Sequence, residues 1–275
     1  MADTNPPSHT GSRLANRVAF VTGAGSGMGR AAVVRFAELG LRVCAIDIAG
    51  ESLDSLAAST ECLAVRADVS DVEQVRSAVG RCRAELGEID LAFLNAGIPS
   101  YMTVASFDPA MYRKVTGVNI DGVVFGIDAI AASMQARTDG TTGGTIVITA
   151  SAAGLRPFAG DPYYTLTKAA LIGFARAVAG PLAADGIALH TLCPGLTDTG
   201  FVAGPVREML EKSGAPFIPA SAIAEAVLDV WQRPIDTAGT VWLIEDPDHL
   251  EPTPHQFHDL RTNAAAQQMK SILAG

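Results

Sequence analysis

The chain alternates short runs of apolar, β-branched residues with longer, alanine-rich amphipathic stretches over most of its length. Arg17–Thr22 and Arg42–Asp47 are two such runs, and Met28–Gly40 between them has the apolar spacing of a helix. Strands that are apolar almost throughout and are joined by helices indicate a parallel sheet covered on both faces. Because such crossovers are right-handed, few topologies remain, and the pattern favours a doubly wound α/β sheet of about seven strands.

The same alternation continues toward the C-terminus. A helix is predicted at Val72–Leu86, another starts near Asp108, and a third carries Tyr164. The other expected strands are Cys62–Ala67, Ile89–Leu94, Thr145–Ala150, Ile187–Cys193 and Thr240–Ile244. We expect a flexible tail at residues 1–13, one domain at 14–245 with a mobile substrate loop at about 196–219, and a C-terminal extension at 246–275.

Composition and charge narrow the class of protein. Of the 275 residues, 48% are hydrophobic and 18% are charged, which suits a large buried core rather than a disordered chain. The net charge of -9 disfavours nucleic acid and anionic membrane surfaces as partners. No uninterrupted apolar run reaches the ~18 residues of a membrane span, and no signal peptide is recognised. The four cysteines lack paired spacing, so we expect buried free thiols and a cytoplasmic protein.

A glycine-rich turn, Gly23–Gly29, directly follows the first predicted strand and opens the first predicted helix. Glycines allow a tight turn and let a pyrophosphate approach the helix N-terminus, where free N–H groups favour negative charge. Gly23, Gly27 and Gly29 have a longer spacing than the common G-x-G-x-x-G fingerprint. Their place between strand and helix indicates a dinucleotide site, although a merely tight connection has the same composition.

Asp47 ends the second predicted strand, where a carboxylate can accept hydrogen bonds from an adenosine ribose and repel a 2′-phosphate. The nearby side chains of Ser26 and Ile48 supply no positive charge that would reverse this preference. The pattern therefore favours NAD(H) over NADP(H). An aspartate at a strand end is also a common turn residue.

Tyr164 and Lys168 are four residues apart in a predicted helix, so their side chains lie on one face, one turn from each other. A fixed positive charge beside a phenol favours the phenolate and lowers a pKa that is ordinarily near ~10. Such a tyrosine can exchange a proton with a substrate oxygen near neutral pH. Tyr163 lacks this option, because Thr167 is the residue four positions on. Taken alone, the pair is also typical of an ordinary helix surface.

Together these features make the chain resemble the short-chain dehydrogenase/reductase family over about residues 14–244. The motifs that carry the resemblance are Thr22-Gly23-x-x-x-Gly27-x-Gly29, Asp68-Val69, Asn95-Ala96-Gly97, Asn119, Ser151, Tyr164-x-x-x-Lys168 and Pro194-Gly195. The resemblance implies a single Rossmann-like domain and reversible hydride transfer between NAD(H) and a secondary alcohol or ketone.

The resemblance also implies catalytic roles. Tyr164 is expected to be the general acid/base, and Lys168 to lower its pKa and to bind the nicotinamide ribose. Ser151, thirteen residues before the tyrosine, is expected to polarise the substrate oxygen. Asn119 matches the position that steadies a water relay leading from the lysine. Taken singly, Ser151 would be interpreted as a helix N-cap.

The cofactor contacts implied by the family fall mostly at the carboxyl ends of predicted strands. Asp68–Val69 match the adenine contacts, Asn95–Gly97 the turn beside the middle of the cofactor, and residues 194–199 the nicotinamide carboxamide. The full expected set is Gly23, Ser26, Gly27, Met28, Gly29, Asp47, Ile48, Asp68, Val69, Asn95, Ala96, Gly97, Tyr164, Lys168, Pro194, Gly195, Thr197 and Thr199.

Apolar side chains near Ser151 and in the loop 196–219 are candidates for the substrate pocket, and equally for core packing. They are Leu155, Phe158, Leu196, Phe201, Val202 and Met209, with Arg156 beside them. They favour a hydrophobic or alicyclic substrate, and Arg156 is interpreted as solvated rather than as a reader of a substrate carboxylate. Gly200 and Gly204 would let the loop move as a lid.

The tail beyond Glu245 departs from the family, whose members often end shortly after the last strand. We interpret it as solvated and without a metal site, because His249, His255 and His258 are irregularly spaced and lack companion cysteines. The departure leaves open whether the family's interface through the last strand forms. The helices that carry the candidate asparagine and lysine resemble the family's dimer-forming pair, which implies a homodimer or homotetramer.

Two other classes of protein remain open. A non-catalytic NAD(H)-binding sensor or scaffold of the same fold is expected to lack one of the four candidate catalytic residues, and this chain has all four. A nucleotide-sugar epimerase or dehydratase is expected to have a longer C-terminal substrate domain than 275 residues accommodate.

Overall fold

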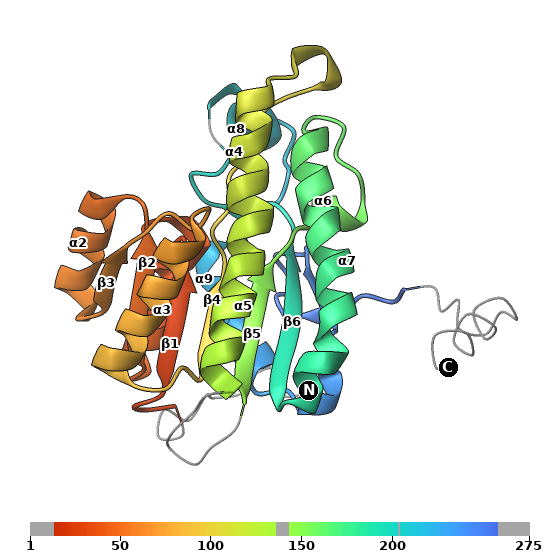
Figure 1. The fold of residues 1–275 in the computed structure, drawn as a ribbon. Helices are drawn as coiled ribbons and strands as arrows, with labels where there is room; N and C mark the ends of the chain where they lie inside the picture. Colours follow the sequence, from red (N-terminus) through yellow and green to blue (C-terminus); the bar gives the residue numbers. More distant parts are fainter. Residues whose placement is uncertain (1–13, 136–142, 203, 258–275) are drawn as a thin grey trace, which may run out of the picture.

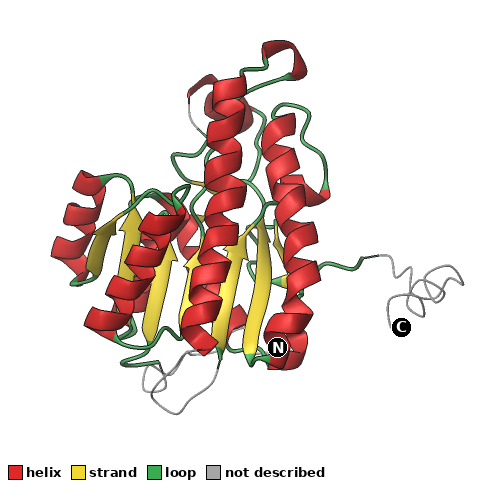
Figure 2. Ribbon diagram, viewed as in Figure 1, coloured by secondary structure: helices red, strands yellow, loops and turns green. Residues whose placement is uncertain are grey.

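A computed structural model describes residues 14–135, 143–202 and 204–257. Their centre is an eight-stranded sheet in the order β10-β9-β6-β5-β4-β1-β2-β3 (Figure 1, Figure 2). Seven strands are parallel, and β10 pairs antiparallel with β9. The strands are β1 (Val18–Thr22), β2 (Arg42–Asp47), β3 (Leu63–Arg66), β4 (Leu91–Leu94), β5 (Gly144–Thr149), β6 (Ile187–Pro194), β9 (Val241–Ile244) and β10 (Thr253–Pro254). The predicted fold class, a doubly wound sheet of about seven parallel strands, is confirmed.

Helices cover both faces of the sheet (Figure 1). On one face α1 and α9 pack on each other, and on the opposite face lie α3, α5 and α7. Successive strand residues serve opposite cores: Phe20 belongs to the core under α3 and α5, and Val21 to the core under α1 and α9. This is why the strands are apolar at nearly every position. The helices are α1 (Gly27–Glu38), α2 (Gly50–Thr60), α3 (Val72–Leu86), α4 (Pro109–Thr116), α5 (Gly122–Gln135), α6 (Ala152–Leu155), α7 (Pro162–Ala184), α8 (Gly204–Lys212) and α9 (Ala220–Trp231).

The loop at 196–219 contains short elements that the sequence analysis did not predict. β7 (Thr197–Asp198) and β8 (Ile218–Pro219) pair in a separate two-stranded sheet, and α8 lies between them in the chain. Ile218 is fully buried in the core under α1 and α9, so the far end of the loop is anchored to the domain. Strands of two residues show no period, which is why they were missed.

Part of the tail returns to the sheet, although both residues of β10 remain exposed to solvent. Beside β10, the His255 N–H donates to the Val241 carbonyl at 2.8 Å. The Phe257 ring lies 3.8 Å from the Arg176 guanidinium of α7 and packs on a small apolar cluster. The edge of β9 is therefore covered by the chain's own tail. His258 lies outside the described residues.

Two helical stretches reach the length and mean hydropathy of a membrane span. They are Pro109–Gln135, which joins α4 to α5, and α7, with mean hydropathies of 1.5 and 1.2 in their most apolar windows. The search for uninterrupted apolar runs missed them because polar residues interrupt both. Both pack on the sheet or its neighbours, where helices of this composition are expected, and 56% and 33% of the two windows is buried. The solvent-exposed side of α7 is mostly apolar.

The strand order contains a switch point between β1 and β4. From β1 the chain builds outward to β2 and β3, and from β4 it builds in the opposite direction to β5, β6 and β9. The connections therefore leave in opposite directions and open a crevice at the carboxyl ends of the two strands. The turn Gly23–Gly29 and the turn that begins at Asn95 both lie at this edge.

Candidate active site

A cavity of about 1260 Å3 opens at the carboxyl edge of the sheet. Turns after β1 to β6, the start of α7 and the segment that follows β6 contribute to its lining. The predicted cofactor residues that line it are Gly23, Ser26, Gly27, Met28, Asp47, Ile48, Asp68, Val69, Asn95, Ala96, Gly97, Tyr164, Lys168, Pro194, Gly195, Thr197 and Thr199. Among the predicted cofactor and catalytic residues, Gly29 and Asn119 lie outside this lining.

The turn between β1 and α1 requires glycine for two distinct reasons. Gly23 and Gly27 have φ angles of 67° and 50°, in the left-handed region that favours glycine. A Cβ on Gly29 would lie 2.1 Å from the Gly23 carbonyl oxygen, which no relaxed structure tolerates. Ser26 begins α1 without a side-chain capping bond, and the first turn of α1 holds no acidic residue. The N–H groups of this helix end are thus arranged to receive an anion.

Carboxylates mark the ends of β2 and β3. Asp47 accepts the Gly25 N–H at 2.8 Å and the Ala49 N–H at 2.9 Å, so it is a turn residue and also presents a carboxylate to the cavity. Asp68 accepts both the N–H and the hydroxyl of Ser70, at 2.9 and 2.7 Å. These local bonds fix the orientation of both carboxylates beside the cavity.

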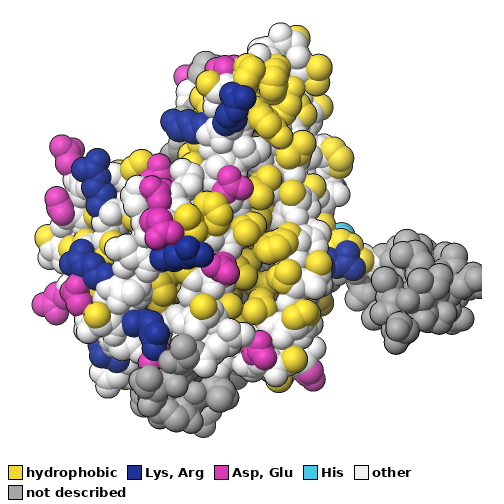
Figure 3. All heavy atoms as spheres, viewed as in Figure 1, with side chains coloured by type: hydrophobic (Ala, Val, Ile, Leu, Met, Phe, Trp, Pro, Cys, Tyr) yellow, Lys and Arg dark blue, Asp and Glu magenta, His cyan; other side chains and the backbone are white. Residues whose placement is uncertain are grey.

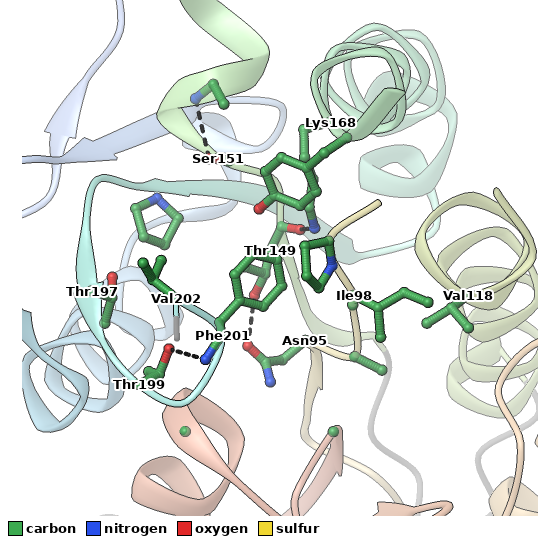
Figure 4. Close-up of a pocket in the computed structure, with 18 of the residues that line it drawn as sticks. Asn95, Ile98, Val118, Thr149, Ser151, Lys168, Thr197, Thr199, Phe201 and Val202 are labelled. Carbon is green, nitrogen blue, oxygen red and sulfur yellow. Dashed lines mark hydrogen bonds between the residues drawn. The ribbon is translucent and has the colours of Figure 1, made fainter. Parts of the chain in front are cut away.

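Asn95 ties together the ends of three strands. Its N–H and that of Ala96 donate to the Thr22 hydroxyl at 2.9 and 3.1 Å, which joins β4 to β1. The Thr149 hydroxyl at the end of β5 donates to the Asn95 side-chain oxygen at 3.2 Å (Figure 4). Gly23 must lack a side chain here, because its Cβ would lie 2.9 Å from the Ala96 Cα.

Ser151, Tyr164 and Lys168 converge on one wall of the cavity. Ser151 caps α6 by accepting the Ala153 N–H at 3.1 Å. Lys168 is buried, and its Nζ donates to the Thr149 carbonyl at 2.7 Å (Figure 4). The same Nζ lies 5.6 Å from the centre of the Tyr164 ring.

Burial controls the protonation of this pair. It raises the pKa of Tyr164 to about 12, against a lowering contribution from the Ser151 side chain, and the charge of Asp161 raises it further. Burial also lowers the pKa of Lys168 to about 8. The pKa of Tyr164 is therefore raised, whereas the four-residue spacing from Lys168 predicted that it would be lowered. The spacing indicates a nearby positive charge but does not show that the phenol is buried away from water. In the protein by itself, the phenol is protonated at neutral pH.

Asn119 lies fully buried in a π-helical segment, η3 (Gly117–Asp121), between α4 and α5. Such segments inside α-helices are frequent at functional sites. The Asn119 side chain accepts the Ile98 N–H at 2.8 Å and donates to the Ile98 carbonyl at 2.9 Å and to the Thr167 hydroxyl at 3.1 Å. It therefore joins the loop after β4 to α7 from behind the cavity wall, and its place in a water relay stays a prediction.

The segment after β6 closes the cavity from the opposite side. The Gly195 N–H donates to the Ile244 carbonyl at 2.7 Å, which holds the segment beside β9. Thr199 lies against the glycine turn, because a Cβ on Gly27 would lie 3.1 Å from the Thr199 methyl group. Pro194 at the end of β6 and Thr197 in β7 line the same wall (Thr197 and Thr199 in Figure 4).

The predicted substrate residues contribute to the rest of the cavity lining, with one exception. Those that line it are Arg156, Phe158, Leu196, Phe201, Val202 and Met209. Leu155 does not, because the one-turn helix α6 directs it toward a small core cluster with Ile172 and Cys193. Arg156 is exposed but makes an ion pair with Glu245, so it is not simply solvated. The Phe201 ring packs on Tyr164, with ring centres 5.4 Å apart.

Among the lining residues that the sequence analysis missed are Tyr101, Asp161 and Glu245. Asp161 caps α7 directly before Pro162, and an aspartate followed by proline at a helix start is a signal that could have found it. Glu245 follows the last predicted strand without any motif. Tyr101 has a φ of 53°, a left-handed conformation that no sequence feature predicts for tyrosine.

Comparison with known proteins agrees with this geometry. Residues 17–209 match the family model described as short chain dehydrogenase. The chain is 36% identical to meso-2,3-butanediol dehydrogenase of Serratia marcescens over 73% of its length and 79% of that protein. It is 32% identical to levodione reductase of Leifsonia aquatica, over 76% and 79% of the two chains. It is also 32% identical to cis-2,3-dihydrobiphenyl-2,3-diol dehydrogenase of Pseudomonas sp. strain KKS102, over 81% of each chain.

Proposed function

The chain belongs to the short-chain dehydrogenase/reductase family and is an oxidoreductase, and from this premise we propose that it interconverts a secondary alcohol and a ketone with NAD(H). The observation that carries the proposal is that Ser151, Tyr164 and Lys168 share one cavity with the glycine-rich turn. For hydride transfer, the protein mainly has to position the dinucleotide, polarise the substrate oxygen and exchange a proton with it.

The residues present fit a dinucleotide. The uncapped N-terminus of α1, with the glycines that bring it close to the cavity, would hold the pyrophosphate. Asp47 would accept hydrogen bonds from the adenosine ribose, and its charge would repel a 2′-phosphate, so NAD(H) is favoured over NADP(H). Lys168 would bind the nicotinamide ribose. When bound, the cofactor supplies or accepts the hydride, and its oxidised ring adds a positive charge to the site.

Tyr164 would move the proton at its phenol oxygen. In ketone reduction the protonated phenol, whose pKa burial raises to about 12, donates to the substrate oxygen that Ser151 holds. In alcohol oxidation the same oxygen must first lose its proton. The Lys168 charge, 5.6 Å from the ring centre, favours that loss while burial opposes it.

The substrate is proposed to be hydrophobic or alicyclic. The side chains around the substrate end of the cavity are mostly apolar, including Phe158, Leu196 and Phe201. Two of the relatives are named for ring compounds, a levodione reductase and a dihydrobiphenyl-diol dehydrogenase, which supports the alicyclic class. The Arg156–Glu245 ion pair at the same end could hydrogen-bond a second oxygen on such a ring.

We also propose that the chain forms a homo-oligomer in the cytoplasm. Figure 3 shows apolar side chains gathered over α5 and α7, and Leu166 of α7 is 45% exposed. Apolar surface of this extent is expected at an interface between subunits. All four cysteines are free and buried, which suits a reducing compartment. The tail segment over β9 would hinder association through that sheet edge.

The proposal is tested by titrating the purified protein into NADH and into NADPH, with fluorescence as readout, and then assaying a panel of cyclic ketones. We expect tighter binding of NADH and turnover of at least one ketone. NADH binding without turnover across a broad panel would favour the non-catalytic sensor instead. No binding of either dinucleotide would contradict the proposal.

A further inference from the structure

Two chain segments face each other across the substrate end of the cavity. One is the loop after β4, which contains Tyr101, and the other is the segment after β7, which contains Phe201; both residues line the cavity. The Tyr101 hydroxyl donates to the Phe201 carbonyl at 2.8 Å. Among the described residues, this is the hydrogen bond that joins the two segments. It connects residues 100 positions apart in the chain.

The backbone of Tyr101 is held in place by a buried carboxylate. Asp161 accepts the N–H groups of Ser100 and Tyr101 at 2.8 and 2.9 Å, and it also accepts the Ser100 hydroxyl. The same carboxylate caps α7 by accepting the Tyr164 N–H at 3.0 Å. Tyr101 has a φ of 53°, which costs free energy in a residue with a side chain. Asp161 therefore compensates for a strained conformation that aims the Tyr101 side chain across the cavity.

We call the hydrogen bond from Tyr101 to Phe201 the bridge. Its Phe201 end is fixed to the glycine-rich turn through Thr199. The Phe201 N–H donates to the Thr199 hydroxyl at 3.2 Å (Figure 4), and Thr199 packs on Gly27 of the glycine-rich turn. The Phe201 ring lies on the Tyr164 ring, with centres 5.4 Å apart. A continuous series of contacts thus runs from the cofactor turn across the substrate end to Tyr101.

We propose that Tyr101 is a specificity-determining residue, whose hydrogen bond to Phe201 closes the cavity over the reacting carbon and limits the substrate to a compact ring. This inference rests on the proposed function and names the size class of its substrate. Tyr101 is 63% exposed, so water competes for its hydroxyl and the bridge can open for entry and release. Asp161 acts through Tyr101 and is a positioning residue.

The first test compares Tyr101→Phe with the wild-type protein by hydrogen exchange, without substrate. The variant keeps the ring and removes the bridging hydroxyl. We expect the backbone amides of residues 199–202 to exchange about fivefold faster, the effect of losing one net hydrogen bond. Tyr112→Phe is the matched control, because Tyr112 packs among aromatic side chains outside the cavity lining. Equal exchange in Tyr101→Phe and the wild type would overturn the proposal, whatever the activity.

The second test measures selectivity with NADH, using cyclohexanone as the compact ketone and 1-decalone as the bulky one. In Tyr101→Phe we expect the ratio of kcat/KM for decalone to that for cyclohexanone to rise about fivefold, mostly through a lower KM for decalone. Asp161→Asn should shift the ratio in the same direction, and Tyr112→Phe should leave it unchanged. An unchanged ratio in Tyr101→Phe would overturn the specificity role even if exchange is faster. If neither ketone nor any other is reduced, the proposed function fails and the specificity role fails with it, while the exchange result still decides whether the bridge exists.

Discussion

The cofactor half and the substrate half of the cavity are built in different ways. In the cofactor half, the glycine turn, Asp47 and Asn95 lie at the ends of neighbouring strands. Short hydrogen bonds fix them there, from backbone N–H groups to the side chains of Asp47 and Thr22. In the substrate half, the walls come from distant segments joined by single side-chain contacts. Tyr101 to Phe201 and Arg156 to Glu245 are two such contacts.

The two halves therefore differ in what determines their structure: the sheet topology in the cofactor half, and a few side-chain contacts in the substrate half. The cofactor half follows from the strand order, because every parallel doubly wound sheet brings the same strand ends together at the switch point. The substrate half depends on contacts that one substitution can remove without disturbing the sheet. Binding of the dinucleotide and choice of substrate should therefore be separable by mutation.

Tyr164→Phe should separate the two halves most sharply. Removing the phenol hydroxyl eliminates the proposed proton donor, so we expect kcat to fall by about a thousandfold, within the range for general acid–base catalysis. NADH affinity, measured by fluorescence titration, should change little. Tyr163→Phe is the control, since Tyr163 packs on Phe107 outside the cavity lining. Retention of a substantial fraction of kcat in Tyr164→Phe would remove the acid/base assignment.

Gly29→Ala should damage the cofactor half instead. The new Cβ would meet the Gly23 carbonyl oxygen at 2.1 Å, so the turn must shift and the helix end must withdraw. We expect NADH affinity to fall by about a hundredfold, equivalent to about 3 kcal/mol of lost binding. Gly80→Ala in α3 is the control, because its Cβ would meet nothing within 4 Å and alanine favours a helix. Unchanged NADH affinity in Gly29→Ala would show that the pyrophosphate does not bind at this turn.

The pH dependence should report the proton at Tyr164. Alcohol oxidation needs the phenolate, whereas burial raises the pKa of Tyr164 to about 12 in the protein by itself. Between pH 6 and 7.5, below the Lys168 pKa of about 8, kcat/KM for oxidation should therefore rise about tenfold per pH unit. Ketone reduction uses the protonated phenol and should stay nearly flat over the same range. An oxidation profile that is independent of pH would contradict this assignment.

Asp47→Ala should have the smallest effect, confined to the choice between dinucleotides. Loss of the carboxylate removes both the ribose acceptor and the repulsion of a 2′-phosphate, so the NAD/NADP ratio of kcat/KM should fall about fivefold. Asp54→Ala, an exposed change in α2, is the control. A ratio that is the same in Asp47→Ala and the wild type would show that another group selects the cofactor.

Most of the fold could be predicted from the sequence because its signals are local. The predicted strand and helix boundaries lie within two residues of those observed, including Arg42–Asp47 and Val72–Leu86, which match fully. The doubly wound class of the sheet followed from the alternation of strands and helices and from the handedness of their connections, whereas the order of the strands came from the structure. β7, β8 and β10 were missed because strands of two residues have no period, and β10 forms through its pairing with β9.

The site divides in the same way. By itself, the sequence determined the glycine turn, the aspartate at the end of β2 and the four-residue spacing of Tyr164 and Lys168, since each depends on neighbours in the chain. Tertiary structure alone decided the rise in the Tyr164 pKa, the turn of Leu155 into the core and the bridge from Tyr101 to Phe201. Burial and long-range contacts depend on which distant segments of the chain pack together in the fold. The local sequence around a residue carries no pattern that identifies its distant partner.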